Sequence, residues 1–116
     1  MKELVMTIKP EKLEVVKNIL DSVNCGGMTI MSAMGCGAQK GMVEDGVNEI
    51  KGFKTNINLL PKIRVEVVVS DDMVEKIITE IREKVATGHV GDGKIFIRNI
   101  EDVVRIRTGE RGERGL

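Results

Sequence analysis

The stretch "TGHVGDGKIF" at residues 87–96 places three glycines and one lysine between two segments with regular apolar patterns. Glycines at 88, 91 and 93 let backbone N–H groups turn toward one point, which is how proteins form anion-binding nests. Lys94 adds a fixed positive charge beside them. The motif is not a Walker A loop, because a helical pattern precedes it and Ile95 follows the lysine where that loop has Ser or Thr. The stretch indicates a phosphate-binding loop, with a plain flexible connector as the alternative.

A second basic element lies just downstream. The segment "VVRIR", residues 103–107, alternates as a short strand does, and a strand would place Arg105 and Arg107 on one face, about 6.5 Å apart along the chain. Two guanidinium forks at that spacing suit neighbouring phosphates, although such pairs are often merely solvated. Together with the glycine loop (residues 87–93), the arginines favour a nucleotide as the ligand.

Few other residues offer chemistry. In "GCGAQKG", residues 35–41, the side-chain carbonyl of Gln39 could ligate a metal ion. His89 has no partners for a metal site, and Cys36 has no neighbouring base to activate its thiol. We find no paired general acid and base and no nucleophile with a base beside it. We therefore expect no catalytic residue and a binding protein that is not an enzyme.

Composition narrows the class of protein. The chain has 116 residues, enough for one domain, and its 41% apolar and 31% charged residues are typical of a soluble globular fold. The 18 basic residues equal the 18 acidic ones, which argues against a nucleic-acid binder. Cys25 and Cys36, with a single histidine in the chain, form neither a disulfide framework nor a zinc site. We expect a cytoplasmic protein with no signal peptide and no membrane-embedded segment.

The apolar pattern predicts the elements that must position these residues. We expect strands at 3–8, 28–34, 63–69 and 94–100, a short strand at 103–107, and helices at 11–23 and 70–85. Gly26 and Gly27 would close the first helix, residues 35–60 follow no period, and the tail would be mobile. This β-α-β, loop, β-α-β order predicts an α+β, ferredoxin-like fold (split βαβ, a double β-α-β) with both helices on one face of a four-stranded sheet. The uncovered face carries apolar residues, so we expect self-association.

These motifs resemble a known family, the PII signal-transduction proteins. "TGHVGDGKIF" followed by "VVRIRTGE" is similar to that family's C-terminal signature, "GMTIMSAMGCGAQKG" to the start of its T-loop, and "LPKIRVEVVV" to the strand after it. The resemblance covers nearly the whole chain. It implies one PII-like domain at residues 1–116, with a long T-loop at about 37–59, a B-loop at about 87–93 and a C-terminal tail at about 108–116.

The resemblance also implies the assembly and its ligands. Members of the family are homotrimers that bind ATP or ADP in clefts between subunits, and Mg²⁺ with ATP permits binding of 2-oxoglutarate. Carried over by position, the nucleotide-binding residues would be Thr29, Gly35, Gly37, Gln39, Lys40, Glu66, Val68, Thr87, Gly91, Gly93, Lys94, Arg105 and Arg107. The 2-oxoglutarate-binding residues would be Gly37, Gln39, Lys40, Gly41 and Lys62, with Gln39 as the ligand of Mg²⁺.

Departures from the common pattern indicate a branch of the family. The sequence contains no tyrosine, so the uridylylation that regulates the enterobacterial type cannot occur. A lengthened T-loop without tyrosine resembles the nitrogen-fixation-linked branch of methanogenic archaea. Members of that branch act with a second PII paralogue to inhibit nitrogenase at its dinitrogenase component, and 2-oxoglutarate relieves the inhibition. The alternatives are a PII protein that regulates an ammonium transporter or another nitrogen-assimilation target, and a small ATP-using enzyme.

Overall fold

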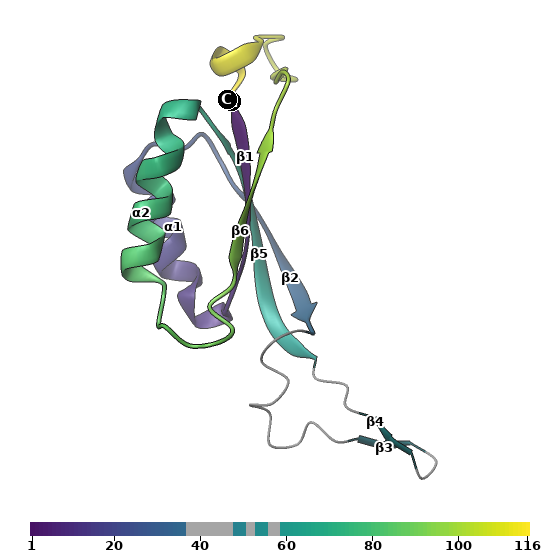
Figure 1. The fold of residues 1–116 in the computed structure, drawn as a ribbon. Helices are drawn as coiled ribbons and strands as arrows, with labels where there is room; N and C mark the ends of the chain where they lie inside the picture. The colour runs from purple at the N-terminus through teal and green to yellow at the C-terminus, as the bar shows by residue number, and fades with distance from the viewer. Residues whose placement is uncertain (37–47, 51–52, 56–58) are drawn as a thin grey trace.

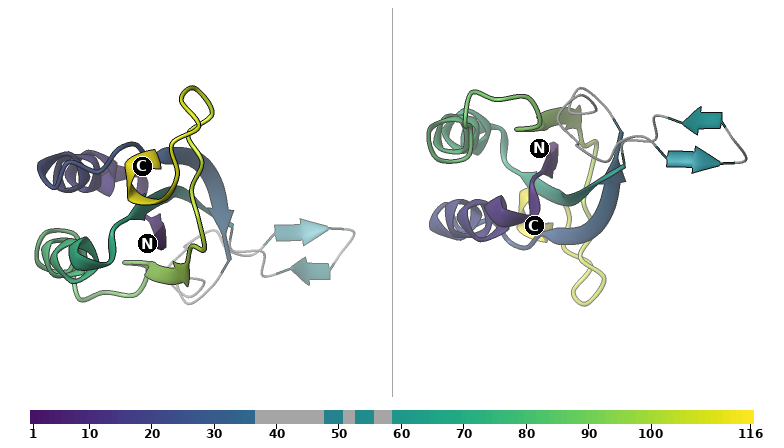
Figure 2. Two further views of the ribbon diagram at one scale, coloured as in Figure 1. Left: turned by 90° about the horizontal axis from the view of Figure 1, so that it is seen from above. Right: turned by 90° about the horizontal axis from the view of Figure 1, so that it is seen from below.

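The computed structural model describes residues 1–36, 48–50, 53–55 and 59–116, and its main element is one four-stranded antiparallel sheet of order β2-β5-β1-β6. The strands are β1 (Lys2–Ile8), β2 (Thr29–Gly35), β5 (Leu60–Val69) and β6 (Lys94–Asn99). Helices α1 (Leu13–Ser22) and α2 (Val74–Lys84) lie side by side on one face of this sheet (Figures 1 and 2). This arrangement confirms the predicted ferredoxin-like α+β fold.

The remaining elements are short. Strands β3 (Asn48–Ile50) and β4 (Phe53–Thr55) pair antiparallel as a separate two-stranded sheet. The 3-10 helices in the described part of the chain are η1 (Pro10–Lys12), η3 (Asp71–Met73) and η4 (Gly112–Gly115). Within the described residues no helix is both long and apolar enough to cross a membrane.

The core lies between the sheet and the two helices. Leu4, Met6 and Ile8 alternate along β1 and are buried on the helix-facing side, as the sequence pattern predicts. The other members of the core follow the same rule on β5 and on the apolar stripes of the helices: Val16, Ile19, Leu20, Val23, Val65, Val67, Val69, Val74, Ile77, Ile81 and Val85. Full burial of each such side chain stabilises the fold by about 1.5–3 kcal/mol.

Among the described residues, no helix lies over the opposite face of the sheet, which we call the helix-free face. Val5 is buried there because it is paired in register with Glu66 on β5 and Phe96 on β6. Phe96 itself is 56% exposed and Met31 is 38% exposed. The uncovered apolar surface supports the expectation that copies of this chain associate through this face.

Two helix ends differ from the prediction. Helix α1 ends before Gly26, because Asn24 adopts the left-handed conformation at φ 54° and Cys25 N–H donates to the Leu20 carbonyl oxygen at 3.3 Å. The second predicted helix was expected to begin at Ser70, but Ser70 precedes η3 and makes no side-chain capping bond. Its hydroxyl instead donates to Asp72 at 2.6 Å.

The C-terminal region contradicts the predicted strand at 103–107. Only a single bridge forms, between Val104 and Arg111, and residues 106–108 form a turn. The carboxylate of Asp102 accepts the N–H groups of Val103 at 2.8 Å and Gly112 at 3.0 Å, which folds the chain back on itself. The tail, for which the sequence predicts no element, contains η4 at residues 112–115, and the Gly112 N–H donates to the Val103 carbonyl oxygen at 3.0 Å.

Candidate functional site

The glycine loop leads from α2 into β6 and lies directly on β1. Gly88, Gly91 and Gly93 adopt positive φ angles of 83°, 100° and 100°. A Cβ atom on Gly93 would lie 1.8 Å from the carbonyl oxygen of Thr7, so only glycine fits at that position. The loop therefore has a defined shape and is not a loose connector.

Asp92 holds the first half of this loop. Its carboxylate accepts hydrogen bonds from the Thr87 N–H at 2.8 Å, the Thr87 hydroxyl at 2.5 Å and the Gly88 N–H at 3.0 Å. These bonds, the Thr87 hydroxyl first, hold the pKa of Asp92 below its usual value. The backbone donors that the sequence assigned to an external anion at Gly88 are thus occupied by an internal carboxylate.

Lys62 on β5 reaches the second half of the loop. Its ammonium group donates to the carbonyl oxygen of Gly91 at 2.9 Å. Burial, and next the positive charge of Lys9, lower the pKa of Lys62 from its ordinary value. At the end of β2, a Cβ atom on Gly35 would lie 3.0 Å from the Lys62 side chain. The end of β2, the start of β5 and the glycine loop therefore meet around this lysine.

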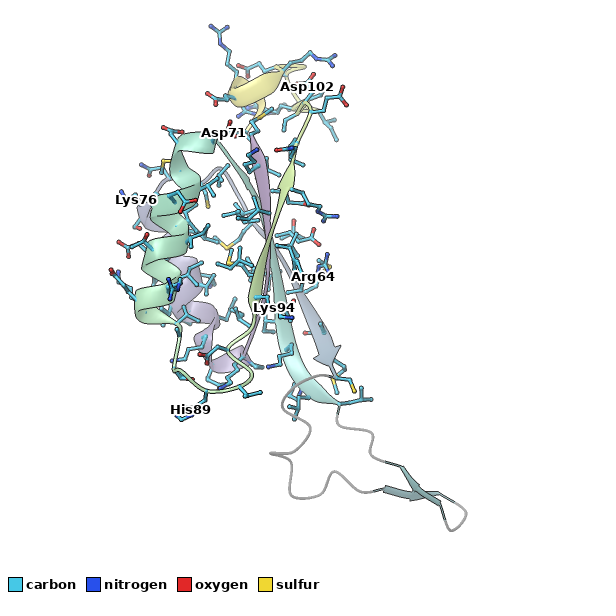
Figure 3. The ribbon with its side chains drawn as sticks, viewed as in Figure 1. Arg64, Asp71, Lys76, His89, Lys94 and Asp102 are labelled. Carbon is cyan, nitrogen blue, oxygen red and sulfur yellow. The ribbon has the colours of Figure 1, made fainter. Side chains whose placement is uncertain are left out.

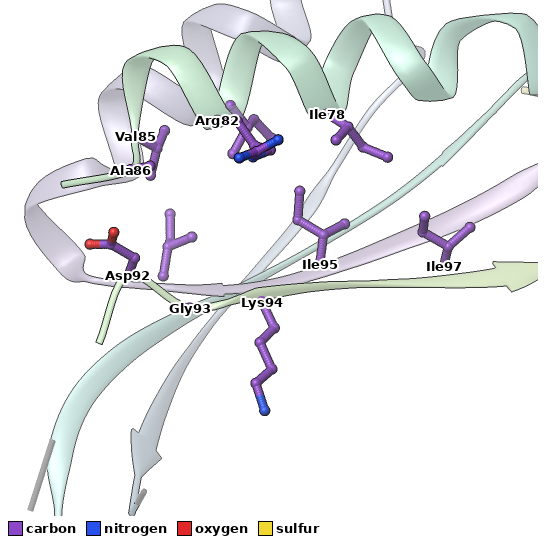
Figure 4. Close-up of a pocket in the computed structure, with 11 residues that line it drawn as sticks. Ile78, Arg82, Val85, Ala86, Asp92, Gly93, Lys94, Ile95 and Ile97 are labelled. Carbon is purple, nitrogen blue, oxygen red and sulfur yellow. The ribbon is translucent and has the colours of Figure 1, made fainter. Parts of the chain in front are cut away.

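These elements line a cleft of about 430 Å³ on the helix-free face, which we call the lysine cleft. Its lining includes the predicted residues Gly35, Lys62, Gly91, Gly93 and Lys94. Lys94 projects to this face, whereas Ile95 and Ile97 project toward α2 (Figure 4). The cleft joins two ammonium groups with glycine backbone, an arrangement that fits a polyanion.

A second cavity at the same end of the sheet has a different character. It measures about 370 Å³, lies between α2 and β6, and is lined largely by apolar side chains, among them Ile78 and Ile95 (Figure 4). This cavity lies on the helix side of β6 and shares Asp92, Gly93 and Lys94 with the lining of the lysine cleft.

A third group of predicted residues lies at the other end of the helix-free face. Thr29, Glu66 and Val68 line a pocket of about 280 Å³ together with Gly26 and Leu116, and we call it the Thr29 pocket. Thr29 and Glu66 are direct partners in the β2–β5 register. Within the described residues, Thr29 and Glu66 belong to this pocket and to no part of the lysine cleft.

The lysine cleft and the Thr29 pocket are far apart within one chain. Thr29 begins the seven-residue strand β2 and Gly35 ends it, so they are about 20 Å apart along the strand. Figure 3 shows Lys94 and His89 toward the glycine-loop end and Asp102 at the opposite end. One chain therefore presents two separated groups of the predicted nucleotide-binding residues.

Arg105 and Arg107 lie at the Thr29-pocket end, but not as a strand pair. Arg105 pairs with Glu110 at 3.2 Å and donates to the carbonyl oxygen of Leu116 at 2.6 Å. Arg107 is exposed in the turn at residues 106–108. The same-face geometry predicted for the two arginines is wrong, because it required the strand that does not form.

Some predicted residues lie outside the described part of the chain. They are Gly37, Gln39, Lys40 and Gly41, together with most of the predicted T-loop at 37–59. Thr87 is described, and it is engaged by Asp92 rather than directed into the lysine cleft. Among the described residues, no group of three or more His, Cys, Asp or Glu side chains could hold a metal ion.

Sequence reasoning missed Asp92 and Phe96 as parts of this region. Asp92 lies between two glycines, and aspartate in such a turn commonly bonds to nearby backbone N–H groups, so a signal was available. Phe96 also lines the lysine cleft. Its position on the exposed face follows from the strand alternation around Ile95 and Ile97.

Comparison with known proteins gives consistent matches. Residues 1–110 match the family model described as nitrogen regulatory protein P-II. The chain is 46% identical over 116 residues to nitrogen regulatory protein P-II 2 of Methanothermobacter thermautotrophicus, covering 100% of this chain and 97% of that protein. It is 46% identical over 112 residues to nitrogen regulatory protein P-II of Bradyrhizobium diazoefficiens, covering 97% and 96%. It is 39% identical over 116 residues to nitrogen regulatory protein GlnK of Escherichia coli, covering 100% of both.

Proposed function

This chain belongs to the P-II family of nitrogen regulatory proteins, and we propose that it reports nitrogen status by binding ATP or ADP together with 2-oxoglutarate. The family consists of signal-transduction regulators and not enzymes, so the outcome of binding is a change in a partner protein. In this proposal the chain acts as a homotrimer and contacts its target through the T-loop.

The main support for this proposal is the separation of the lysine cleft from the Thr29 pocket within one chain. Both lie on the helix-free face, at opposite ends of the sheet, and this face leaves Phe96 and Met31 partly uncovered. A head-to-tail contact between copies in a closed ring can bring one end of each chain beside the other end of its neighbour. Each nucleotide would then be held by the lysine cleft of one subunit and the Thr29 pocket of the next.

The roles of the residues follow from this arrangement. In the lysine cleft, Gly91, Gly93 and Lys94 would hold the phosphates, while the neighbour's Thr29, Glu66 and Val68 would hold the adenosine. Arg105 and Arg107 lie at the same end as the Thr29 pocket, so the neighbour would add them to the phosphates. Gly35, Gly37, Gln39, Lys40 and Thr87 complete the proposed set. The cations of the lysine cleft fit an anionic ligand.

The proposed effector site lies beside the nucleotide. Lys62 would pair with a carboxylate of 2-oxoglutarate, and backbone N–H groups from Gly37 to Gly41 would assist. Gln39 would hold Mg²⁺ through its side-chain oxygen, and the ion would supply positive charge that favours both anionic ligands. Burial of Lys62 beside Lys9 supports this role, because a second cation nearby increases the gain from an incoming anion.

Ligands in the lysine cleft would act on the root of the T-loop. Gly35 and Leu60 are paired in register, so the segment between them leaves and re-enters the sheet at the cleft. A ligand that prefers one arrangement of this root shifts the population of the whole segment. Binding of 2-oxoglutarate would in this way change the T-loop conformation that a target protein contacts.

The dinitrogenase component of nitrogenase is our proposed target, acted on with a second PII paralogue. The absence of tyrosine and the long T-loop support this choice over an ammonium transporter or another nitrogen-assimilation target. The test is acetylene reduction by purified nitrogenase with this protein, its paralogue and Mg-ATP, with and without 2-oxoglutarate. We expect inhibition that 2-oxoglutarate relieves; unchanged activity, with binding to the ammonium transporter instead, would favour the alternative.

Calorimetry tests the ligand proposal directly. We expect heat on addition of ATP or ADP, and heat on addition of 2-oxoglutarate only when Mg-ATP is present. A folded oligomer that binds neither nucleotide contradicts the proposal, and so does 2-oxoglutarate binding of equal strength without Mg-ATP. Rapid ATP turnover that one side-chain change abolishes would instead indicate an enzyme.

A further inference from the structure

We propose that residues 110–116, the C-terminal segment, are an internal competitor of the nucleotide, with Glu110 occupying the guanidinium group of Arg105 that the phosphates need. The inference rests on the proposed nucleotide function and adds to it a residue, Glu110, that governs how readily the site accepts its ligand. Three sets of contacts support it.

The first set joins Arg105 to both ends of the C-terminal segment. Its guanidinium group donates to the Glu110 carboxylate at 3.2 Å and to the Leu116 carbonyl oxygen at 2.6 Å. Its backbone N–H also donates to the Glu110 carbonyl oxygen at 2.9 Å. Two of the five N–H donors of this side chain, one on each terminal nitrogen, are therefore directed into the segment and away from an external anion.

The second set of contacts gives the C-terminal segment a defined conformation. Asp102 pairs with Arg111 at 2.6 Å and accepts the Gly112 N–H at 3.0 Å. A Cβ atom on Gly115 would lie 2.9 Å from the Glu110 carbonyl oxygen, so the turn around Arg105 closes tightly on a glycine. Figure 1 shows the segment folded back at the upper end of the sheet.

The third set puts the end of the segment into the Thr29 pocket. Leu116 lines this pocket together with Thr29, Glu66 and Val68. A Cβ atom on Gly26 would lie 2.9 Å from the Leu116 carbonyl carbon, so the two backbones are in close contact. The segment thus stands between Arg105 and the surface on which the adenosine would rest.

Competition follows from the chemistry of the guanidinium group. Its planar fork pairs with a carboxylate or with a phosphate in the same geometry, and the two anions compete for the same N–H donors. A phosphate that pairs with the Nη1 side of Arg105 would therefore displace Glu110. Arg105 and Glu110 are 35% and 43% exposed, so their ion pair is weak enough to be exchanged reversibly.

The test is calorimetry of the full chain with ADP, comparing Glu110→Gln with Glu113→Gln. Both variants remove one negative charge from the C-terminal segment, but only Glu110 pairs with Arg105 among the described residues. We expect Glu110→Gln to bind ADP about two- to fivefold more tightly than the wild type, the range set by a partly exposed ion pair. Glu113→Gln should change the affinity by less than about 1.5-fold, because exposed charges not in contact are screened.

A double-mutant cycle separates competition from a general effect of charge. In an Arg105→Ala background, Glu110→Gln should leave ADP affinity unchanged, because the contact that it removes no longer exists. An equal gain in Glu113→Gln, or a gain that persists without Arg105, overturns the inference while leaving ADP binding intact. Wild-type protein that folds and assembles but binds no ADP overturns the proposed nucleotide function itself.

Discussion

The ammonium group of Lys62 donates a hydrogen bond to the carbonyl oxygen of Gly91, 2.9 Å away, and so joins β5 to the glycine loop. Lys62 lies two residues after Leu60, which is paired with Gly35 at the root of the T-loop. One side chain thereby connects the proposed effector site, the proposed phosphate site and the segment that would move. An anion that recruits Lys62 acts on all three.

Replacing Lys62 with methionine tests this connection, because it keeps the aliphatic stem and removes the charge. We expect 2-oxoglutarate affinity, measured by calorimetry with Mg-ATP, to fall at least about tenfold, since a hydrogen bond to a charged group contributes about 1.5–3 kcal/mol. ATP affinity should fall less than about threefold, because the half-buried Gly91 can bond to water instead. Lys76→Met, at an exposed position on α2, is the control and should leave both affinities within about twofold. An equal loss of both ligands in Lys62→Met contradicts the assignment.

Arg107 is exposed and is not held by the C-terminal segment as Arg105 is, so its loss reports on the nucleotide alone. We expect Arg107→Ala to weaken ATP binding by about 1.5–3 kcal/mol through loss of a charge-assisted bond to phosphate. Arg114→Ala removes the same charge from an exposed position in η4 and should leave ATP affinity within about twofold. Unchanged ATP affinity in Arg107→Ala counts against its proposed role.

Gly93 tests the shape of the glycine loop through stability. Its Cβ would lie 1.8 Å from the Thr7 carbonyl oxygen, a backbone atom that cannot rotate away, so Gly93→Ala should lower the free energy of unfolding by at least about 3 kcal/mol. Gly88→Ala is the matched control, because it also has positive φ but nothing within 4 Å of the added atom. We expect Gly88→Ala to lower the free energy of unfolding by only about 1 kcal/mol. Similar urea midpoints for the two variants would contradict the close contact with β1.

The sheet and its two faces could be predicted from the sequence, because alternation along β5 marks Val65, Val67 and Val69 as one buried row. The predicted strand at 103–107 failed for a local reason. Asp102 takes up backbone N–H groups that a strand ladder would use, and Gly109 and Gly112 turn the chain back with φ angles of 74° and 65°. An apolar alternation over only five residues is weak evidence for a strand, and here these side-chain bonds determine the backbone conformation instead.

The residue types of the candidate site could be predicted from the sequence, but its division into the lysine cleft and the Thr29 pocket could not. Gly93 and Lys94 stood out by type and spacing, whereas the distance between Lys94 and Thr29 depends on strand register, which a single sequence does not specify. The bond of Glu110 to Arg105 likewise comes from the folded geometry, since Glu110 is an ordinary acidic residue in the sequence. Asp92 differs, because its place between two glycines is typical of an aspartate that bonds to nearby backbone N–H groups.

Asp92 predicts a pH effect confined to the glycine loop. Hydrogen bonds from Thr87 and Gly88 lower the pKa of Asp92, so the folded state favours the ionised carboxylate. The order that these bonds give the glycine loop is present in full above the pKa of an unfolded aspartate, about 3.9. That order is lost as pH falls through the lower folded pKa. The amide N–H signals of Thr87 and Gly88, followed by NMR, should therefore shift with a midpoint below about pH 3.9. Asp92→Asn should abolish this transition, and a midpoint at or above that value contradicts it.

Mixing subunits tests whether two chains complete one site. We expect homotrimers of Lys94→Ala to have three sites that lack the phosphate lysine, and homotrimers of Arg107→Ala to have three that lack the arginine. In a closed ring containing both, one junction joins an intact lysine cleft to an intact Thr29-pocket end. The reason is that Lys94 lies toward the glycine-loop end of the sheet (Figure 3), whereas the segment after β6, which includes Arg107, lies at the other end (Figure 1). Unfolding and refolding the mixture should therefore restore one tight ATP site per mixed trimer, measurable by calorimetry, while neither variant alone shows it. If Lys94 and Arg107 served the same chain's site, every site in the mixture would carry one defect and no tight site would return.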